Sequence, residues 1–219
     1  MPDYAVLDAA LTRVGVPFTK EESMAAHTSF KIGGPAARFL RIADAAALSA
    51  ALRVLREAAV PYFVLGNGSN LLVPDEGLRG AVLALEGSFK AVELTGSGRL
   101  LCGSGASLAS ICAFARSNAL TGLEFAWGIP GSLGGALYMN AGAYGGEMKQ
   151  VVSRVWFLEP DGTPASLAGE ALCFGYRTSA FTNTKRVITK AELQLESGAE
   201  AEIAAKMDDL MQRRKSKQP

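Results

Sequence analysis

Two glycine-rich stretches carry the residues of this sequence that are best suited to bind a ligand. The longer runs from Gly128 to Gly146, reads GIPGSLGGALYMNAGAYGG and holds seven of the 24 glycines. Glycine lets another group approach the main chain closely, at an entropic cost that an ordinary connection has no reason to carry. The stretch contains no Lys or Arg, so backbone N–H groups and small hydroxyls would meet the ligand, which suits a diphosphate or the edge of a heterocycle. Tight helix packing through small residues is the structural alternative.

The shorter stretch is Gly66-Asn67-Gly68-Ser69-Asn70, between the apolar runs Val60–Leu65 and Leu71–Val73, which we expect to be strands. Such a loop offers several N–H groups and the polar side chains of Asn67, Ser69 and Asn70 to an anion. A dinucleotide fingerprint would need a third glycine at Leu71, and a P-loop would need Gly-Lys-Ser or Gly-Lys-Thr, which is absent. A classical Rossmann domain is therefore disfavoured. A plain hairpin remains the alternative, because Asn-Gly is its commonest signal.

Arg177 is the candidate for chemistry on a negatively charged substrate. It lies in FGYRTSAF, residues 174–181, between aromatic and hydroxyl side chains. A guanidinium in such a setting can hold a carboxylate or an enolate oxygen. An ordinary surface arginine is the alternative.

His27 is the only histidine and, with no carboxylate or cysteine partner evident nearby in sequence, we expect a surface or hydrogen-bonded structural role for it.

Composition limits the class of protein. The 22 basic and 21 acidic side chains give a net charge of +1, so no strong field gathers nucleic acid or an anionic membrane. No apolar run reaches the ~20 residues of a membrane helix, and we expect a cytoplasmic protein. The scattered cysteines lack any CxxC spacing, which argues against a zinc site or a disulfide framework; we expect each to be a small buried apolar residue. They are Cys102, Cys112 and Cys173.

Periodicity predicts an α+β fold. Helices are expected over residues 7–14, 48–55, 108–115 and 200–218, where apolar residues recur at helical spacing. Strands are expected over residues 37–42, 60–65, 81–85, 91–94, 100–102, 151–158 and 187–195. Asp161-Gly162 predicts a hairpin turn.

The ordered set of motifs resembles the flavoenzyme family of UDP-N-acetylenolpyruvoylglucosamine reductases, from bacterial cell-wall (peptidoglycan) synthesis. The matching pieces are HTSFKIGGPA (27–36), GNGSNLLV (66–73), GLEF (122–125), GIPGSLGG (128–135), NAGAYG (140–145) and YRTS (176–179). The resemblance implies a two-lobed FAD-binding fold of the vanillyl-alcohol oxidase (PCMH) type, with lobes at residues 1–86 and 87–219. FAD would lie between the lobes without a covalent bond, a covalent anchor at His27 being the remoter alternative.

The resemblance also implies the site residues. The cofactor-binding residues would be Gly66, Asn67, Gly68, Ser69, Asn70, Leu71, Ile129, Pro130, Gly131, Ser132, Gly134, Gly135, Asn140, Gly142 and Ala143. Tyr144 and Arg177 would bind the substrate, and Arg177 would be the catalytic arginine that stabilises developing negative charge. No metal site is expected.

In the family, NADPH gives a hydride to FAD, and the reduced flavin passes it to the enolpyruvyl double bond of the nucleotide sugar, forming UDP-N-acetylmuramate. The proton-donating serine and a catalytic glutamate belong to a third domain, and the sequence, which ends at Pro219, has no match to either. We therefore expect the FAD-binding portion of such a reductase, with little turnover alone. The alternatives are a non-catalytic flavin-binding module and an FAD-dependent oxidase.

Overall fold

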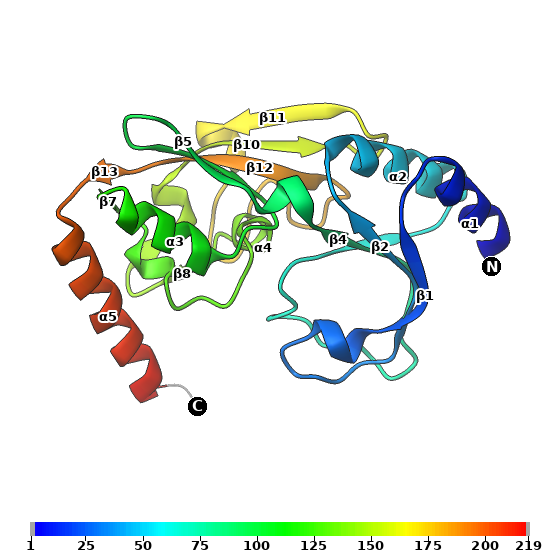
Figure 1. Cartoon of the computed structure of the whole chain (residues 1–219), viewed down its shortest axis with the longest axis horizontal. Coiled ribbons are helices and arrows are strands. Elements are labelled where there is room, and N and C mark those ends of the chain that lie inside the picture. Colours follow the sequence, from blue (N-terminus) through cyan, green and yellow to red (C-terminus); the bar gives the residue numbers. More distant parts are fainter. Residues whose placement is uncertain (1–2, 218–219) are drawn as a thin grey trace.

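Two β-sheets organise the chain, and each is built from one part of the sequence (Figure 1). The computed structural model describes residues 3–217. The first sheet has the order β1-β2-β4-β3, with β1 at Phe18–Ser23, β2 at Pro35–Ile42, β3 at Tyr62–Leu65 and β4 at Leu78–Leu85. The second has the order β11-β10-β12-β6-β5, with β5 at Val92–Gly96, β6 at Arg99–Gly103, β10 at Val152–Leu158, β11 at Pro164–Ala168 and β12 at Val187–Gln194.

Within residues 3–217, five α-helices accompany the sheets. They are α1 (Tyr4–Arg13), α2 (Ala45–Glu57), α3 (Leu108–Ser117), α4 (Leu133–Tyr138) and α5 (Glu200–Lys217). The four predicted helices are confirmed, although Gln218, the predicted end of the last, lies outside the described residues. The short α4, which lies inside the glycine-rich stretch, was not predicted, because it is too short to give a clear periodic signal. The α+β class is confirmed, and no helix among residues 3–217 combines the length and apolar character needed to cross a bilayer.

Short elements complete the chain. The paired strands are β7 (Leu120–Thr121) with β13 (Glu196–Ser197), and β8 (Gly142–Ala143) with β9 (Gly146–Glu147). The 3-10 turns are η1 (Met24–His27), η2 (Gly87–Lys90), η3 (Glu124–Ala126), η4 (Met148–Gln150) and η5 (Gly169–Leu172).

The first sheet has a parallel centre. Strand β4 pairs in parallel with both β2 and β3, while β1 is antiparallel to β2. The predicted strand, helix, strand unit is therefore present as β2-α2-β3, with β4 inserted between its strands. The prediction that residues 71–73 form a strand is wrong: the segment is irregular and Leu72 is 70% exposed. An apolar triplet bounded by turn residues is too short a signal to distinguish a strand from a loop.

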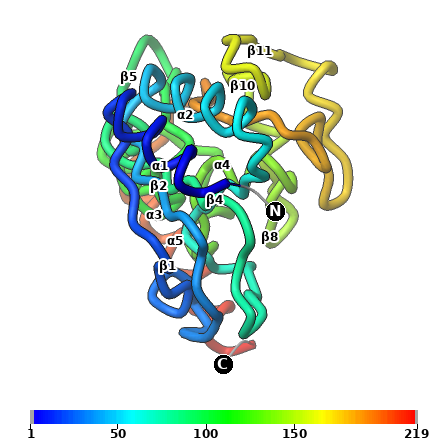
Figure 2. The backbone as a smooth tube through the Cα atoms, turned by 90° about the vertical axis from the view of Figure 1, so that its right-hand side faces the viewer, coloured from blue at the N-terminus to red at the C-terminus, as the bar shows by residue number. Residues whose placement is uncertain are grey.

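One face of the first sheet is covered by α1 and α2, which lie next to each other (Figure 2). The buried face of α2 matches its predicted apolar positions, Leu48, Ala51, Leu52 and Leu55. Leu158 and Val187 of the second sheet join this same core, so the two sheets share buried side chains.

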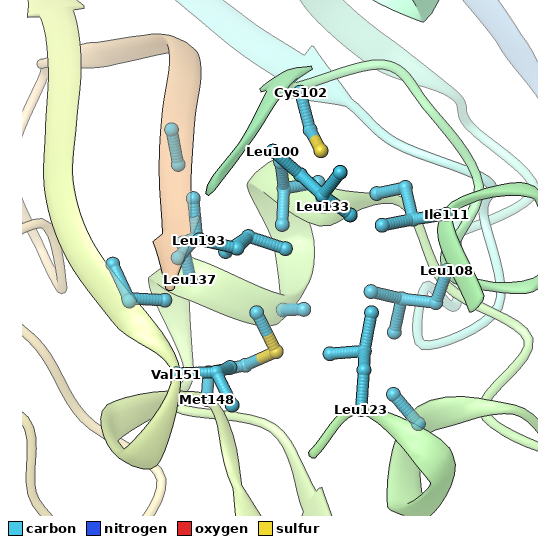
Figure 3. Close-up of a cluster of buried hydrophobic side chains, with 14 of the residues drawn as sticks. Leu100, Cys102, Leu108, Ile111, Leu123, Leu133, Leu137, Met148, Val151 and Leu193 are labelled. Carbon is cyan, nitrogen blue, oxygen red and sulfur yellow. The ribbon is translucent and has the colours of Figure 1, made fainter. Parts of the chain in front are cut away.

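The second core lies between the second sheet, α3 and α4. Figure 3 shows Leu133 and Leu137 of α4 among Leu100 and Cys102 of β6 and Leu193 of β12. This face of α4 is therefore fixed by apolar packing, which holds the glycine-rich segment around it in place. Antiparallel pairing of β10 with β11 confirms the predicted turn at Asp161-Gly162.

Candidate functional site

A pocket of about 310 Å³ opens where the parallel strands of the first sheet end. Its wall includes Arg41 from β2, Leu65–Asn67 at the end of β3, and Ala84–Glu86 at the end of β4. Ligands of sheets with parallel strands bind at their carboxyl ends, because the connecting loops meet there. Gly105 and Ser132, from the part of the chain that carries the second sheet, also line it.

The two glycine-rich stretches meet in this pocket. A Cβ placed on Gly66 would lie 2.5 Å from Ser132 Oγ, and one on Gly68, which has a φ of +63°, would overlap the carbonyl oxygen of His27. Position 68 therefore admits only glycine, whereas an alanine at position 66 would have to displace the Ser132 hydroxyl. Within residues 3–217, none of the backbone N–H groups from Gly66 to Asn70 has a hydrogen-bond acceptor. The loop therefore keeps these main-chain donors available, as an anion-binding loop must.

The second stretch uses its glycines differently from our expectation. The N–H groups of Leu133 and Gly134 donate to the carbonyl oxygens of Ala106 and Ser104, at 2.9 and 2.7 Å. Ser132 Oγ caps the helix at the N–H of Gly135, at 3.5 Å. The N–H groups of Leu133 and Gly134 are therefore already bonded within the protein, because the turn of α4 is held by the loop after β6. The expected contact of this stretch with a ligand, through N–H groups and small hydroxyls, stays a prediction. The packing alternative accounts for Gly134, where a Cβ would lie 3.2 Å from Ser104.

The remaining expected cofactor residues lie around these two segments. Leu71 is partly buried, Pro130 and Gly142 are exposed, and Ile129, Gly131 and Ala143 are intermediate. None of these residues belongs to the pocket wall, and neither do Ser69 and Asn70. Gly66, Asn67 and Ser132 do belong to it. The structure thus brings together part of the expected set in one cavity.

Ser104 adjoins the same region and was not a sequence candidate. Its side chain is 3% exposed, and its hydroxyl oxygen has no hydrogen-bond partner among the described residues. Buried hydroxyls are usually paired, so an unpaired one next to a cavity needs an explanation such as a water or a ligand. Its neighbour Gly105 lines the pocket.

Charged side chains also line the pocket, which the cation-free stretches did not indicate. Arg41 pairs with Glu86 at 3.0 Å and with Glu22 at 3.8 Å. Lys90 belongs to the pocket wall too, and no carboxylate within residues 3–217 pairs with it. Neither cation belongs to the two motifs, so no local pattern indicated them, and only the folding of the chain brings them to the pocket.

His27 has a structural partner in the same wall. Its Nε2 lies 2.9 Å from Glu22 Oε1, and its ring stacks on Phe39 with centroids 4.3 Å apart. The hydrogen-bonded structural role is therefore correct, but the statement that no carboxylate lies nearby in sequence is wrong, since Glu22 is only five residues away. The hydrogen bonds from His27 and Thr19 lower the pKa of Glu22 below its ordinary value.

Neither of the expected substrate residues lines this pocket. Tyr144 is 43% exposed, and Arg177 is exposed with its Nη1 3.8 Å from the sulfur of Met139. Both residues have left-handed backbone angles, with φ of +53° and +55°. Asn140, by contrast, is buried, and its side chain hydrogen bonds only to the protein.

The cysteines divide into two kinds. Cys102 and Cys112 are buried, and burial raises the pKa of each thiol to about 12. Cys173 is exposed, so the expectation that all three are buried is wrong for it. It follows η5 in a left-handed conformation, which ends the turn.

Among residues 3–217 no three His, Cys, Asp or Glu side chains gather as metal ligands would.

Comparison with known proteins identifies the family. Residues 36–168, more than half of the chain, match the family model described as an FAD binding domain. The chain is 43% identical over 199 residues to the UDP-N-acetylenolpyruvoylglucosamine reductase of Clostridioides difficile, covering 91% of this chain and 65% of that protein. It also superimposes on the crystal structure of the Thermus caldophilus reductase with a TM-score of 0.79 and 34% identity, over 93% of this chain and 70% of that one. The chain belongs to the UDP-N-acetylenolpyruvoylglucosamine reductase family.

More distant structures agree on the fold. A chitooligosaccharide oxidase superimposes with a TM-score of 0.65 at 19% identity, which supports the shared FAD-binding fold alone. The expected family and fold are thus confirmed. The chain spans about 65% of the length of the curated relatives it matches, such as that of Caldanaerobacter subterraneus at 44% identity.

The pocket fits the cofactor that the family model names. A diphosphate needs several N–H donors at one place. The N–H groups of the Gly66–Asn70 loop have no acceptor within residues 3–217, and Gly66 and Asn67 of this loop line the pocket. Lys90 adds a positive charge at the wall, and the unpaired Ser104 hydroxyl is a further polar group nearby.

Proposed function

We propose that this chain is the FAD-binding part of a reductase that converts UDP-N-acetylenolpyruvoylglucosamine to UDP-N-acetylmuramate in peptidoglycan synthesis, with NADPH as hydride donor. The observation that supports this most is the single pocket shared by Gly66 and Ser132. The net reaction adds a hydride and a proton across the enolpyruvyl double bond and oxidises NADPH to NADP⁺. Bound FAD would supply the two-electron carrier between the donor and the double bond.

In this proposal the first part of the chain, residues 1–86, and the second, residues 87–219, form the two lobes of the site. The first sheet ends at Leu85 and the second begins at Val92, which supports a boundary between these residues. The N–H groups of the Gly66–Asn70 loop would hold the phosphates of FAD. Residues of the segment from Ile129 to Gly135, together with Gly142 and Ala143, would contact the flavin.

Arg177 and Tyr144 act on the substrate. The guanidinium of Arg177 binds the carboxylate of the enolpyruvyl group and stabilises the negative charge that develops there when the double bond accepts a hydride. Its exposure leaves the side chain accessible to a ligand. Tyr144 lines the same site. The reaction belongs in the cytoplasm, where both nucleotide substrates are available.

The experiment starts with the absorption spectrum of the purified chain after addition of FAD and removal of the excess. Retained flavin absorbance supports the proposal. NADPH is then added without oxygen, followed by the enolpyruvyl nucleotide sugar, and flavin absorbance reports reduction and reoxidation. Bleaching by NADPH supports the reductase, and slow recovery on addition of the sugar is the result expected of a chain with little turnover alone.

Two other results would support different functions. Bound flavin that neither NADPH nor the sugar affects would favour a non-catalytic flavin-binding module. Steady hydrogen peroxide production in air would favour an FAD-dependent oxidase. A chain that retains no FAD at all would contradict the proposal.

A further inference from the structure

Tyr144 and Arg177 both lie in tight turns with strained backbones. Strands β8 and β9 pair through Gly142 with Glu147 and Ala143 with Gly146, which leaves Tyr144 and Gly145 as a two-residue turn. Their φ angles are +53° and +84°. Such a turn with two left-handed residues favours Asn-Gly, so a tyrosine in its first position is unusual. Retained strain of this kind concentrates at functional sites.

The second turn repeats this feature. Gly175 and Thr178 exchange two hydrogen bonds, at 3.1 and 3.4 Å, with Tyr176 and Arg177 between them. Arg177, with a φ of +55°, occupies the third position of the turn, where glycine is preferred. Tyr176 beside it is 94% exposed. The turn thus presents two large side chains at a backbone cost that a plain surface loop would avoid.

Asn140 connects the two turns. Its Nδ2 donates to Glu147 Oε2 at 3.0 Å, at the base of the first turn, and to the carbonyl oxygen of Gly175 at 3.1 Å, at the base of the second. Its Oδ1 accepts from the N–H of Lys149 at 2.9 Å. An amide has two N–H donors, and both are used. Asn140 is 4% exposed, so its side chain has no donor left for a cofactor.

We propose that Asn140 is a positioning residue that joins these turns, so that Tyr144 and Arg177 face one carboxylate-bearing ligand as a unit. The ligand part of this inference rests on the proposed function, whereas the coupling of the turns does not. Ser179 Oγ ties the residues after the second turn to the carbonyl oxygen of Tyr138 at 2.8 Å. Asn140 instead bonds to the turn itself, and no other side chain within residues 3–217 bonds to both turns.

The first test measures amide hydrogen exchange in the chain without ligand. In Asn140→Ala we expect the N–H groups of Lys149 and Thr178 to exchange about tenfold faster. The N–H of Lys149 loses its acceptor, Asn140 Oδ1. The N–H of Thr178 donates to the carbonyl oxygen of Gly175, which loses its bond from Asn140. Asn140→Asp keeps an acceptor for Lys149 but can donate to neither Gly175 nor Glu147, and it sets a second carboxylate against that of Glu147. We therefore expect the Thr178 turn to loosen as in Asn140→Ala, and the first turn to loosen as well. Asn118→Ala is the matched control, since its side chain also donates to a carbonyl oxygen, that of Phe114 at 2.8 Å, away from both turns.

The second test titrates FAD into the chain, and then the enolpyruvyl nucleotide sugar into the FAD-loaded chain. We expect Asn140→Ala to raise the Kd of the sugar about tenfold while the Kd of FAD stays within twofold. Asn118→Ala should change neither.

Three results would overturn the role of Asn140. The first is an amide exchange rate of Thr178 in Asn140→Ala equal to that in the wild type. The second is an FAD Kd that rises in this variant as much as the sugar Kd, and the third is an unchanged sugar Kd. A wild-type chain that binds FAD but no sugar would instead count against the proposed function, and the exchange at Thr178 would then decide whether Asn140 couples the turns.

Discussion

Gly66 and Ser132, 66 positions apart in the sequence, face each other so closely that a Cβ on Gly66 would lie 2.5 Å from Ser132 Oγ. One residue follows the end of β3 and the other caps α4, so their approach defines how the two parts of the chain meet. The backbone of Gly66 is not left-handed, and space rather than conformation requires glycine there. A methyl group at position 66 would therefore have to displace the Ser132 hydroxyl at the pocket wall.

Replacing that glycine tests the pocket. In Gly66→Ala we expect the Kd of FAD to rise about tenfold or more, because the new methyl group pushes Ser132 toward the ligand. Equilibrium dialysis with FAD measures this. Gly96→Ala is the control, since its Cβ would meet nothing closer than Arg99 Cδ at 4.0 Å. Adding Ser132→Ala to Gly66→Ala should recover part of the affinity; an unchanged Kd in the single variant would show that FAD does not use this gap.

Ser104→Ala should leave the ligand-free chain as stable as before or raise its free energy of unfolding by up to about 1 kcal/mol, because it removes a buried hydroxyl that has no partner. Ser153→Ala is the contrasting variant, since Ser153 Oγ lies 2.6 Å from Glu192 Oε1. Its loss should lower the free energy of unfolding by about 1 kcal/mol. Urea denaturation compares the three proteins, and a marked loss of stability in Ser104→Ala would mean that the hydroxyl has an unseen structural partner.

Lys90→Gln should weaken FAD binding roughly three- to fivefold, because it removes a positive charge at the pocket wall, partly screened by solvent. The difference from the wild type should shrink as salt is added, since salt screens the lost attraction. Lys190→Gln is the control: Lys190 lies on β12 near the ring of Trp156, outside the pocket. Equal effects from the two variants would exclude a local role for Lys90.

Acid should weaken the attachment of α5. Burial alone would raise the pKa of Glu124, but hydrogen bonds from Thr121, the backbone and Lys206 outweigh it and lower the pKa below its ordinary value of 4.5. The folded chain thus binds this proton less readily than the unfolded chain, so the contribution to stability is present at neutral pH and is lost as the pH falls below 4.5.

Glu124→Gln checks this dependence. We expect its free energy of unfolding to be lower at pH 7 by about 1 kcal/mol or more, with a shallower decline in acid than in the wild type. Glu196→Gln, on the exposed β13, should follow the wild-type curve. Identical acid curves for Glu124→Gln and the wild type would mean that another carboxylate governs the loss.

The elements with regular apolar spacing could be predicted from the sequence. The buried positions of α2 and the alternation of β12, with Lys190 and Gln194 exposed, follow directly from local periodicity. Strand β1 could not be found in this way: it reads FTKEES, is mostly exposed and contains Glu21 at a φ of +49°. It forms because β2 offers an edge to pair with, which is a property of the fold and not of the segment.

The candidate site likewise contains residues that a local sequence pattern indicates and residues that it does not. Gly66, Gly68 and Ser132 are recognisable because a close approach restricts the residue type. Arg41 and Lys90 reach the pocket only because parallel strands end together, and no local pattern marks that. The role of Asn140 depends on which atoms its amide meets, so a motif that contains it cannot distinguish a cofactor contact from a link between two turns.

Binding of FAD by the purified chain, measured by isothermal titration, tests most directly that the two glycine-rich segments form one cofactor site. We expect one FAD per chain, with an affinity that falls about tenfold or more in Gly66→Ala and is unchanged in Gly96→Ala. No binding by the wild-type chain, or equal binding by all three proteins, would contradict it.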